Sequence, residues 1–203
     1  MIISEQDCKR ISTAIRAAES KTSGEIVCVL AQTSSDTTAL PILIAALIAL
    51  ALPWLFVALT AMSVHRILSL QAIIFFVLLV LLSLPSVRVA LMPRAARRAV
   101  AYRVAMEQFA IRGIAHKRDR TGILIFVSLA ERYARIIADE GIAACVHQSE
   151  WQEAVNELIA HTSTGHMTEG FISAIEICGN VLARSFPRAE TSGDELPDRI
   201  YLI

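Results

Sequence analysis

The chain of 203 residues is 55% hydrophobic and 19% charged, and its mean hydropathy is +0.54. Soluble domains are usually about 45–50% apolar and about 25% charged, so the excess indicates either a large core or a membrane segment. Nineteen basic residues balance nineteen acidic ones, so the composition does not imply a general affinity for nucleic acid, and we expect no nucleic-acid partner. Almost all of the apolar excess lies between Ala39 and Val87.

The N-terminal region predicts a helix over residues 4–20 and a strand over residues 25–31. Ser4 is a suitable N-cap, and Asp7 stands three residues later, as in a capping box. The strand is a continuous β-branched run, which is typical of a strand covered on both faces. The first ten residues lack the apolar region of a secretory signal, so the first membrane segment is expected to direct its own insertion.

Two uncharged stretches follow, over residues 39–64 and 67–87, separated by His65 and Arg66. A helix needs about 20 apolar residues to cross a bilayer, and both stretches are long enough. Helices of a soluble core keep a polar stripe, and neither stretch has one at helical spacing. The pattern predicts a tight transmembrane hairpin that leaves both flanking segments on the same side of the membrane.

Basic residues indicate which side that is. Arg88, Arg94, Arg97 and Arg98 follow the second stretch, whereas the turn contains only Arg66. An excess of Arg near the ends of membrane spans marks the cytoplasmic side, so we expect a cytoplasmic domain. The same four arginines can also face anionic lipid headgroups, at about 1 kcal/mol per basic residue. The two interpretations are compatible.

The remaining chain predicts an α/β arrangement. A strand, a crossover helix and a second strand form a β-α-β unit, and the hairpin is inserted into the crossover. The expected elements are a helix over 93–111, strands over 123–128 and 132–138, and helices over 149–161 and 168–185.

The elements define the expected domain organisation. Residues 1–38 and 89–187 form one discontinuous α/β domain, and residues 39–88 form the transmembrane hairpin. Residues 188–203 are polar and are predicted to be a flexible tail.

The four cysteines are widely spaced and form no CxxC or Cys/His pair. Cys28 and Cys145 lie among apolar residues and are predicted to be buried thiols. Nothing in the spacing indicates a disulfide framework, which is consistent with a reducing compartment.

Asp139 and Glu140, at the end of a predicted strand, are candidate oxygen ligands for Ca²⁺ or Mg²⁺. Glu25 and Glu131 are candidates to join them. A turn-forming aspartate and a solvated glutamate explain the same pair, and this is the simpler interpretation because Ca²⁺ takes about six to eight oxygens. No catalytic residue is assigned, since the sequence contains no P-loop, nucleophile elbow or dinucleotide-binding motif.

Several segments resemble the TPM domain, in its bacterial membrane-bound branch, where a transmembrane hairpin interrupts the domain. The segments are Thr22-Ser-Gly-Glu-Ile-Val-Cys-Val-Leu, Gln108-Phe109, Arg120-Thr-Gly-Ile-Leu-Ile-Phe-Val-Ser-Leu-Ala-Glu-Arg and Ile136-Ile-Ala-Asp-Glu-Gly-Ile. The resemblance implies a compact α/β/α sandwich with a small mixed sheet.

The family is associated with assembly and repair of membrane complexes, receptor modulation, acid phosphatase activity and divalent-cation binding, so membership alone does not define a function. The soluble branch has a Gly-rich acidic loop where this chain has Asp139-Glu-Gly-Ile, which weakens the case for a cation or phosphatase site.

Our leading hypothesis is a non-enzymatic accessory protein of the bacterial inner membrane that binds another membrane protein or complex. The alternatives are a membrane-tethered phosphatase that requires a divalent cation, and a cation-binding regulator without turnover.

Overall fold

A computed structural model describes residues 3–34, 39–59, 63–84, 87, 92–114, 120–188 and 196–203. The chain divides into two compact units. The α/β unit comprises Met1–Ser34 and Ala101–Ile203, and the hairpin unit comprises Ser35–Val100.

Among the described residues, a mixed sheet of four strands in the order β3-β2-β1-β4 forms the centre of the α/β unit. β1 is parallel to both of its neighbours, whereas β3 is antiparallel to β2. Every residue of β1 and β2 is buried, as expected from their continuous apolar sequences. The strands are β1 (Glu25–Ala31), β2 (Gly122–Ser128), β3 (Tyr133–Ala138) and β4 (Ile200–Leu202).

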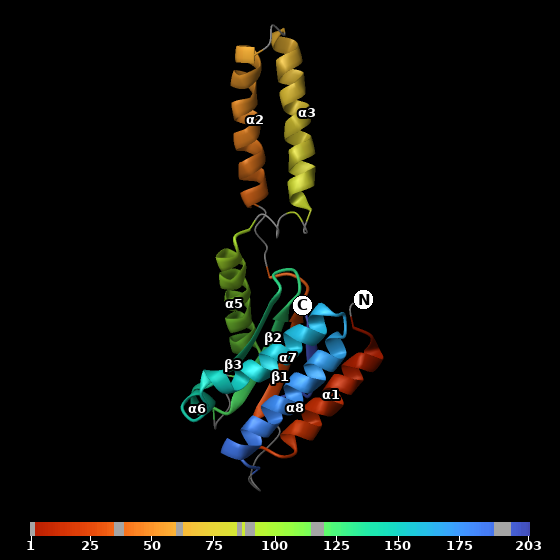
Figure 1. Cartoon of the computed structure of the whole chain (residues 1–203), viewed down its shortest axis with the longest axis vertical. Helices are drawn as coiled ribbons and strands as arrows, with labels where there is room; N and C mark the ends of the chain where they lie inside the picture. The colour runs from red at the N-terminus through yellow and green to blue at the C-terminus, as the bar shows by residue number, and fades with distance from the viewer. Residues whose placement is uncertain are drawn as a thin grey trace. The chain divides into compact units, whose positions relative to one another are not determined.

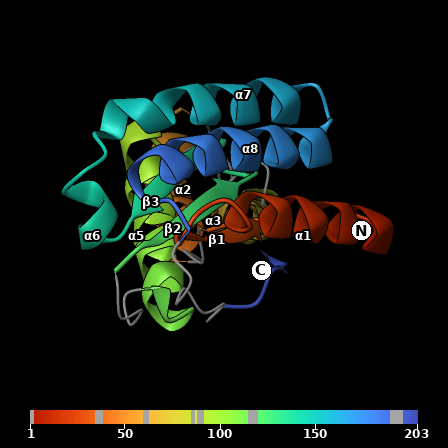
Figure 2. The ribbon, with the colours of Figure 1, turned by 90° about the horizontal axis from the view of Figure 1, so that it is seen from below.

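Helices cover both faces of this sheet (Figure 1, Figure 2). α1, α7 and α8 pack over one face in the larger core, which includes Ile15, Leu158 and Phe171. α5 covers the other face through Ala105 and Phe109. The predicted α/β/α sandwich is therefore confirmed. The elements are α1 (Glu5–Glu19), α5 (Arg94–Ile111), the short α6 (Glu140–Ala143), the 3-10 helix η2 (Gln148–Trp151), α7 (Gln152–Ser163) and α8 (Met167–Ser185).

The predicted capping box of α1 is also confirmed. The Ser4 hydroxyl accepts a hydrogen bond from the Asp7 N–H at 3.1 Å, and the Asp7 carboxylate accepts one from the Ser4 N–H at 3.3 Å. These two bonds satisfy main-chain donors that the first turn of a helix leaves free.

The hairpin unit contains α2 (Ala39–Leu59) and α3 (Val64–Ser83), which pack against each other. Both helices are long and apolar enough to span a membrane, and only 11% of each apolar window is buried. A core helix of a soluble domain is mostly buried, so the two helices differ from that class.

The predicted two-residue link between the helices is wrong. His65 and Arg66 lie in the first turn of α3, whose hydrogen bonds already include that from the Arg66 N–H to the Ser63 carbonyl. A charged residue breaks the apolar pattern of a sequence but does not break a helix. The polarity of His65 and Arg66 therefore led to a wrong prediction of where α3 begins.

The predicted flexible tail is wrong for its last residues. Within 188–203, β4 pairs in parallel with β1, and residues 189–195 lie outside the described part of the chain. Main-chain bonds join Gln32 N–H to the Ile203 carbonyl at 2.8 Å and Ile203 N–H to the Leu30 carbonyl at 3.0 Å. The last four residues, Ile200-Tyr-Leu-Ile, are apolar and suit a strand. The polar residues before them led to the prediction of a flexible tail for the whole segment.

A carboxyl pair lies at the start of this C-terminal segment. Glu19 and Asp198 interact directly, and burial together with Asp198 raises the pKa of Glu19 from its ordinary 4.5 to about 9. The Glu19 carboxyl also accepts the Ile26 N–H at 2.7 Å, and Asp198 accepts the Arg16 guanidinium at 3.0 Å. The pair therefore connects the end of α1, the start of β1 and the C-terminal segment.

We expect this pair to make the stability of the α/β unit depend on pH. Because Glu19 binds its proton more tightly when folded, its contribution is complete below pH 4.5 and is lost as the pH rises toward 9. Glu19→Gln keeps a neutral donor and acceptor and removes the titration. Unfolding temperatures of the full chain in detergent should decline more steeply from pH 5 to pH 9 in the natural protein than in the variant. Parallel declines would contradict the assignment.

Candidate functional site

The carboxyl ends of β1 and β2 lie side by side at one edge of the sheet, since Ala31 is opposite Ser128 in a parallel pair. The chain leaves the α/β unit here after Ser34, and β2 turns here into β3. The end of a parallel strand pair is a common position for binding residues in α/β folds. We call this region the carboxyl-edge site.

Glu131 joins the two strand ends. The residue is 4% exposed, and its carboxylate accepts hydrogen bonds from the Ser34 N–H at 3.0 Å, the Thr33 hydroxyl at 3.3 Å and the Ser128 hydroxyl. The hydroxyls of Ser34 and Ser128 are 2.9 Å apart. The carboxylate therefore fixes the position at which the chain leaves the sheet.

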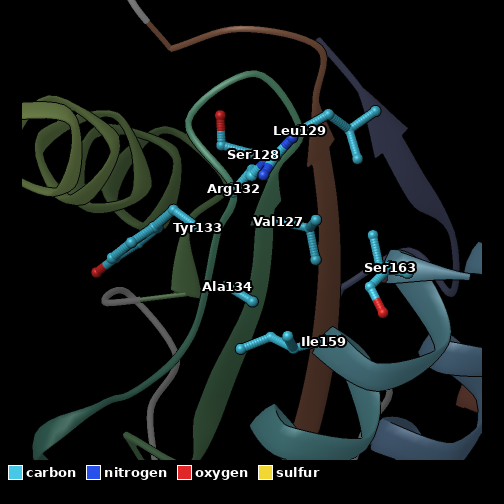
Figure 3. A pocket seen from close by; sticks show the side chains of 9 residues that line it. Val127, Ser128, Leu129, Arg132, Tyr133, Ala134, Ile159 and Ser163 are labelled. Carbon is cyan, nitrogen blue, oxygen red and sulfur yellow. The ribbon is translucent and has the colours of Figure 1, made fainter. Parts of the chain in front are cut away.

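A cavity of about 420 Å³ opens beside this network, between the β2–β3 turn and the C-terminal end of α7 (Figure 3). Val127, Ala134 and Ile159 supply apolar walls, and Thr162 and Ser163 supply hydroxyls. Both hydroxyls donate to carbonyls of α7 itself, at 2.6 Å and 2.8 Å. The cavity thus suits an apolar side chain better than a strongly polar ligand.

Asp139 and Glu140 adopt mainly structural roles. Asp139 caps α6, where its carboxylate accepts the Glu140 N–H at 2.7 Å. The Arg120 guanidinium lies 3.8 Å from the Asp139 carboxylate and 2.6 Å from that of Glu140. An arginine therefore already supplies positive charge to both candidate ligands.

The suggested grouping of these residues with Glu131 is wrong. β3 runs antiparallel to β2, so Asp139 follows Ala138 at the Ile123 end of the sheet, whereas Glu131 adjoins the Ser128 end. Glu25, opposite Gly122, is at the same end as Asp139. Among the described residues, no group of three His, Cys, Asp or Glu side chains is arranged to hold a metal ion.

The predicted lipid-facing arginines are partly described. Arg94, Arg97 and Arg98 all lie in the first two turns of α5, and Arg88 lies outside the described residues. Arg94 and Arg98 are exposed, and their i, i+4 spacing places them on one side of the helix. The N-terminus of a helix disfavours cations, so helix stability does not explain this cluster.

One cysteine prediction is confirmed and the other is wrong. Cys28 is buried, and burial raises the pKa of its thiol, whereas Cys145 is exposed. Cys178, which was not singled out, is also buried with a raised pKa. Cys145 follows the short α6. Its neighbours in the sequence are apolar, but its side chain lies outside the core.

Comparison with known proteins agrees with this architecture. A family model of the TPM domain matches residues 85–181. The matched stretch of this chain is thus similar to the TPM domain. The match includes β2, β3, α6, α7 and most of α8, and thus the turn that carries Glu131.

A solved structure with a TPM-like fold is similar to the chain over almost its full length. It is the NMR structure of BA42 protein from the psychrophilic bacterium Bizionia argentinensis, with a TM-score of 0.62 and 21% identity. The alignment covers 99% of this chain and 95% of that one. At this identity the likeness concerns the fold. No curated protein matches the chain.

The Glu131 network gives a second prediction. Glu131→Ala leaves the buried Ser34 N–H and Ser128 hydroxyl without their acceptor, which should lower the free energy of unfolding by about 1–3 kcal/mol. Glu157→Ala, at a side chain 47% exposed, is the control and should change the free energy of unfolding by less than about 0.5 kcal/mol. Denaturant unfolding of the full chain in detergent measures both. Equal effects of the two substitutions would rule out the proposed role of Glu131.

Proposed function

We propose that this protein is a membrane-anchored binding protein of the bacterial inner membrane. Its hairpin inserts into the bilayer, and its TPM domain acts from the cytoplasmic side on the assembly or maintenance of a membrane protein complex. The observation that carries the proposal is the pair of apolar, exposed helices α2 and α3, inserted between β1 and α5; the only charged residue of the two helices is Arg66, in the first turn of α3.

The lengths of these helices support insertion. α2 has 21 residues and α3 has 20, and a helix of that length extends for about 30 Å, the thickness of the hydrocarbon core. Leu50, Trp54 and Val80 are more than 65% exposed within the chain itself. Lipid accommodates such side chains, whereas water makes their exposure unfavourable.

The arginines support the orientation. Arg66, in the first turn of α3, is the single Lys or Arg at that end of the hairpin, whereas Arg88, Arg94, Arg97 and Arg98 follow the second helix. This asymmetry favours a cytoplasmic TPM domain. Three arginines in the first two turns of α5 are unfavourable for the helix dipole. Contact with anionic lipid headgroups would explain why they are there.

Two observations favour binding over catalysis. Asp139 and Glu140 are paired with Arg120, and the Ser128 hydroxyl donates to Glu131, so these reactive groups have structural partners. The cavity at the carboxyl-edge site is lined mainly by apolar side chains.

A cation-dependent phosphatase and a cation-binding regulator remain the alternatives, with Ca²⁺ or Mg²⁺ as the ion. One observation favours them: the Asp139 Oδ2 atom is buried and makes no hydrogen bond within the described part of the chain. Asp139 is therefore the position at which to test them.

Membrane integration is the first test. After cell lysis without detergent, the full chain should sediment with membranes and should remain there after extraction at alkaline pH. Detergent should release it. Recovery of the folded chain in the supernatant before detergent is added would contradict the anchor.

Hydrolysis is the second test. The full chain in detergent is expected to show no Mg²⁺- or Ca²⁺-stimulated hydrolysis of p-nitrophenyl phosphate above that of Asp139→Asn. Asparagine also caps helices, so this variant keeps the N-cap of α6 while it removes the charge. Turnover in the natural protein that disappears in the variant would establish the phosphatase instead. Calorimetric Ca²⁺ binding without turnover would establish the regulator.

A further inference from the structure

Arg132, in the β2–β3 turn of the carboxyl-edge site, has a strained backbone. Among the described residues, the non-glycine residues with positive φ are Arg120 and Arg132, at 52° and 51°. A side chain makes this conformation costly, whereas glycine adopts it easily. Strain of this kind is concentrated where the side chain binds something.

The two arginines differ in their partners. The Arg120 guanidinium is paired with the carboxylates of Asp139 and Glu140. Arg132 is exposed, and its guanidinium forms no ion pair or hydrogen bond with any residue that the structure describes. The adjacent Glu131 carboxylate is held by the buried hydrogen bonds described above. Arg132 is therefore available to an anion from outside the domain.

The cavity of about 420 Å³ beside Arg132 is otherwise uncharged. Arg132 is the one charged residue among the described residues that line it. Leu129, Ala134 and Ile159 supply hydrocarbon surface, and Ile159 is 48% exposed. Figure 3 shows Arg132 at the turn, with Ala134 and Ile159 further along the cavity. A fitting ligand has an apolar body and one anionic group.

Chain connectivity keeps this cavity close to the membrane. Four residues separate Ser34, at the end of the first part of the α/β unit, from Ala39, where α2 begins. A chain extends at most about 3.6 Å per residue, so this link spans at most about 18 Å. The Ser34 hydroxyl lies 2.9 Å from that of Ser128, which lines the cavity. With α2 inserted as proposed, lipids of the cytoplasmic leaflet are within reach.

A lipid chain suits this cavity better than a peptide does. The main-chain groups of a peptide need hydrogen-bond partners once they leave water. The lining hydroxyls of Ser128, Thr162 and Ser163 already donate to groups of the domain itself. An acyl chain needs no such partners and passes from one apolar environment to another. Covering Ile159 and pairing with Arg132 then favour the bound state.

We propose that the cavity at the carboxyl-edge site binds one acyl chain of an anionic phospholipid from the cytoplasmic leaflet, with the lipid phosphate paired to Arg132. This inference rests on the proposed function, because the membrane anchor brings the lipid within reach of the cavity. It adds to that function a second attachment of the α/β unit to the membrane, at the ends of β1 and β2 and separate from the hairpin.

Photo-crosslinking in nanodiscs tests the lipid directly. The full chain is placed in phosphatidylcholine nanodiscs with a minor fraction of phosphatidylglycerol that carries a diazirine on one acyl chain, and labelled peptides are identified by mass spectrometry. We expect labels on α2 and α3, which lie in the bilayer, and also on β3 and α7 around Ala134 and Ile159. The same acyl chain on phosphatidylcholine should label β3 and α7 about fivefold less, because that headgroup is zwitterionic.

Variants separate the cavity from the charge. Ala134→Leu fills the cavity and should reduce labelling of α7 about tenfold, while α2 and α3 are labelled as before. Arg132→Gln should reduce labelling of α7 about fivefold, whereas Arg184→Gln, at an exposed arginine on α8, should leave it unchanged.

Arg132→Gly separates lipid binding from a structural role of the arginine. Glycine accepts the positive φ of this position, so the variant should lose labelling of α7 without any fall in its unfolding temperature. A loss of stability comparable to the loss of labelling would assign Arg132 to the fold instead.

Three further outcomes overturn the proposal. Labels confined to α2 and α3 would mean that the cavity takes no bilayer lipid, even if a diazirine fatty acid labels α7 in detergent. Equal labelling of α7 by the two headgroups would remove the role of Arg132. Labelling that Ala134→Leu leaves unchanged would mean contact with the bilayer surface rather than entry into the cavity. None of these results alters membrane sedimentation or the absence of hydrolysis, so they are distinguishable from failure of the proposed function.

Discussion

The parallel pairing of β1 with β2 constrains the rest of this fold. Two parallel neighbours require a crossover that starts at the carboxyl end of the first strand and returns to the amino end of the second. α5 makes that return, packed on the sheet through Ala105 and Phe109. The inserted segment must therefore leave the sheet at Ser34 and rejoin the domain at α5. If the inserted helices span a membrane, as we propose, an even number of spans satisfies this requirement and a single span does not, which agrees with the two helices α2 and α3.

The same constraint accounts for the position of the buried carboxylate. Glu131 accepts hydrogen bonds from the Ser34 main chain and the Ser128 hydroxyl, at the point where the insertion departs. In an uninterrupted domain, a short loop would hold this strand end. Here the following residues belong to a separate unit, and a buried carboxylate with several donors holds the end instead.

The predictable and unpredictable features differ in their physical origin. Local patterns predicted β1, β2, the capping box of Ser4 and Asp7, and both apolar helices, because each depends on residues close in sequence. The strand at Ile200 was missed because its pairing with β1 is formed across the whole chain. The Glu131 network was missed for a similar reason: the Ser128–Glu131 spacing indicates a turn, but the approach of Ser34 depends on strand register. Asp139 was identified correctly as a strand-end residue, yet Arg120 opposite it was not foreseen.

The measurement that tests the central claim most directly is labelling of single cysteines in intact and permeabilised spheroplasts with a membrane-impermeant maleimide. Glu5→Cys, His65→Cys and Arg184→Cys are made in a chain whose four native cysteines are replaced by alanine. They mark the domain before the insertion, the first turn of α3 next to its connection with α2, and the domain after the insertion. Two spans predict that only His65→Cys reacts in intact spheroplasts and that all three react after permeabilisation. Labelling that differs between Glu5→Cys and Arg184→Cys would contradict the hairpin, because the two halves of the sheet would then lie on opposite sides of the membrane.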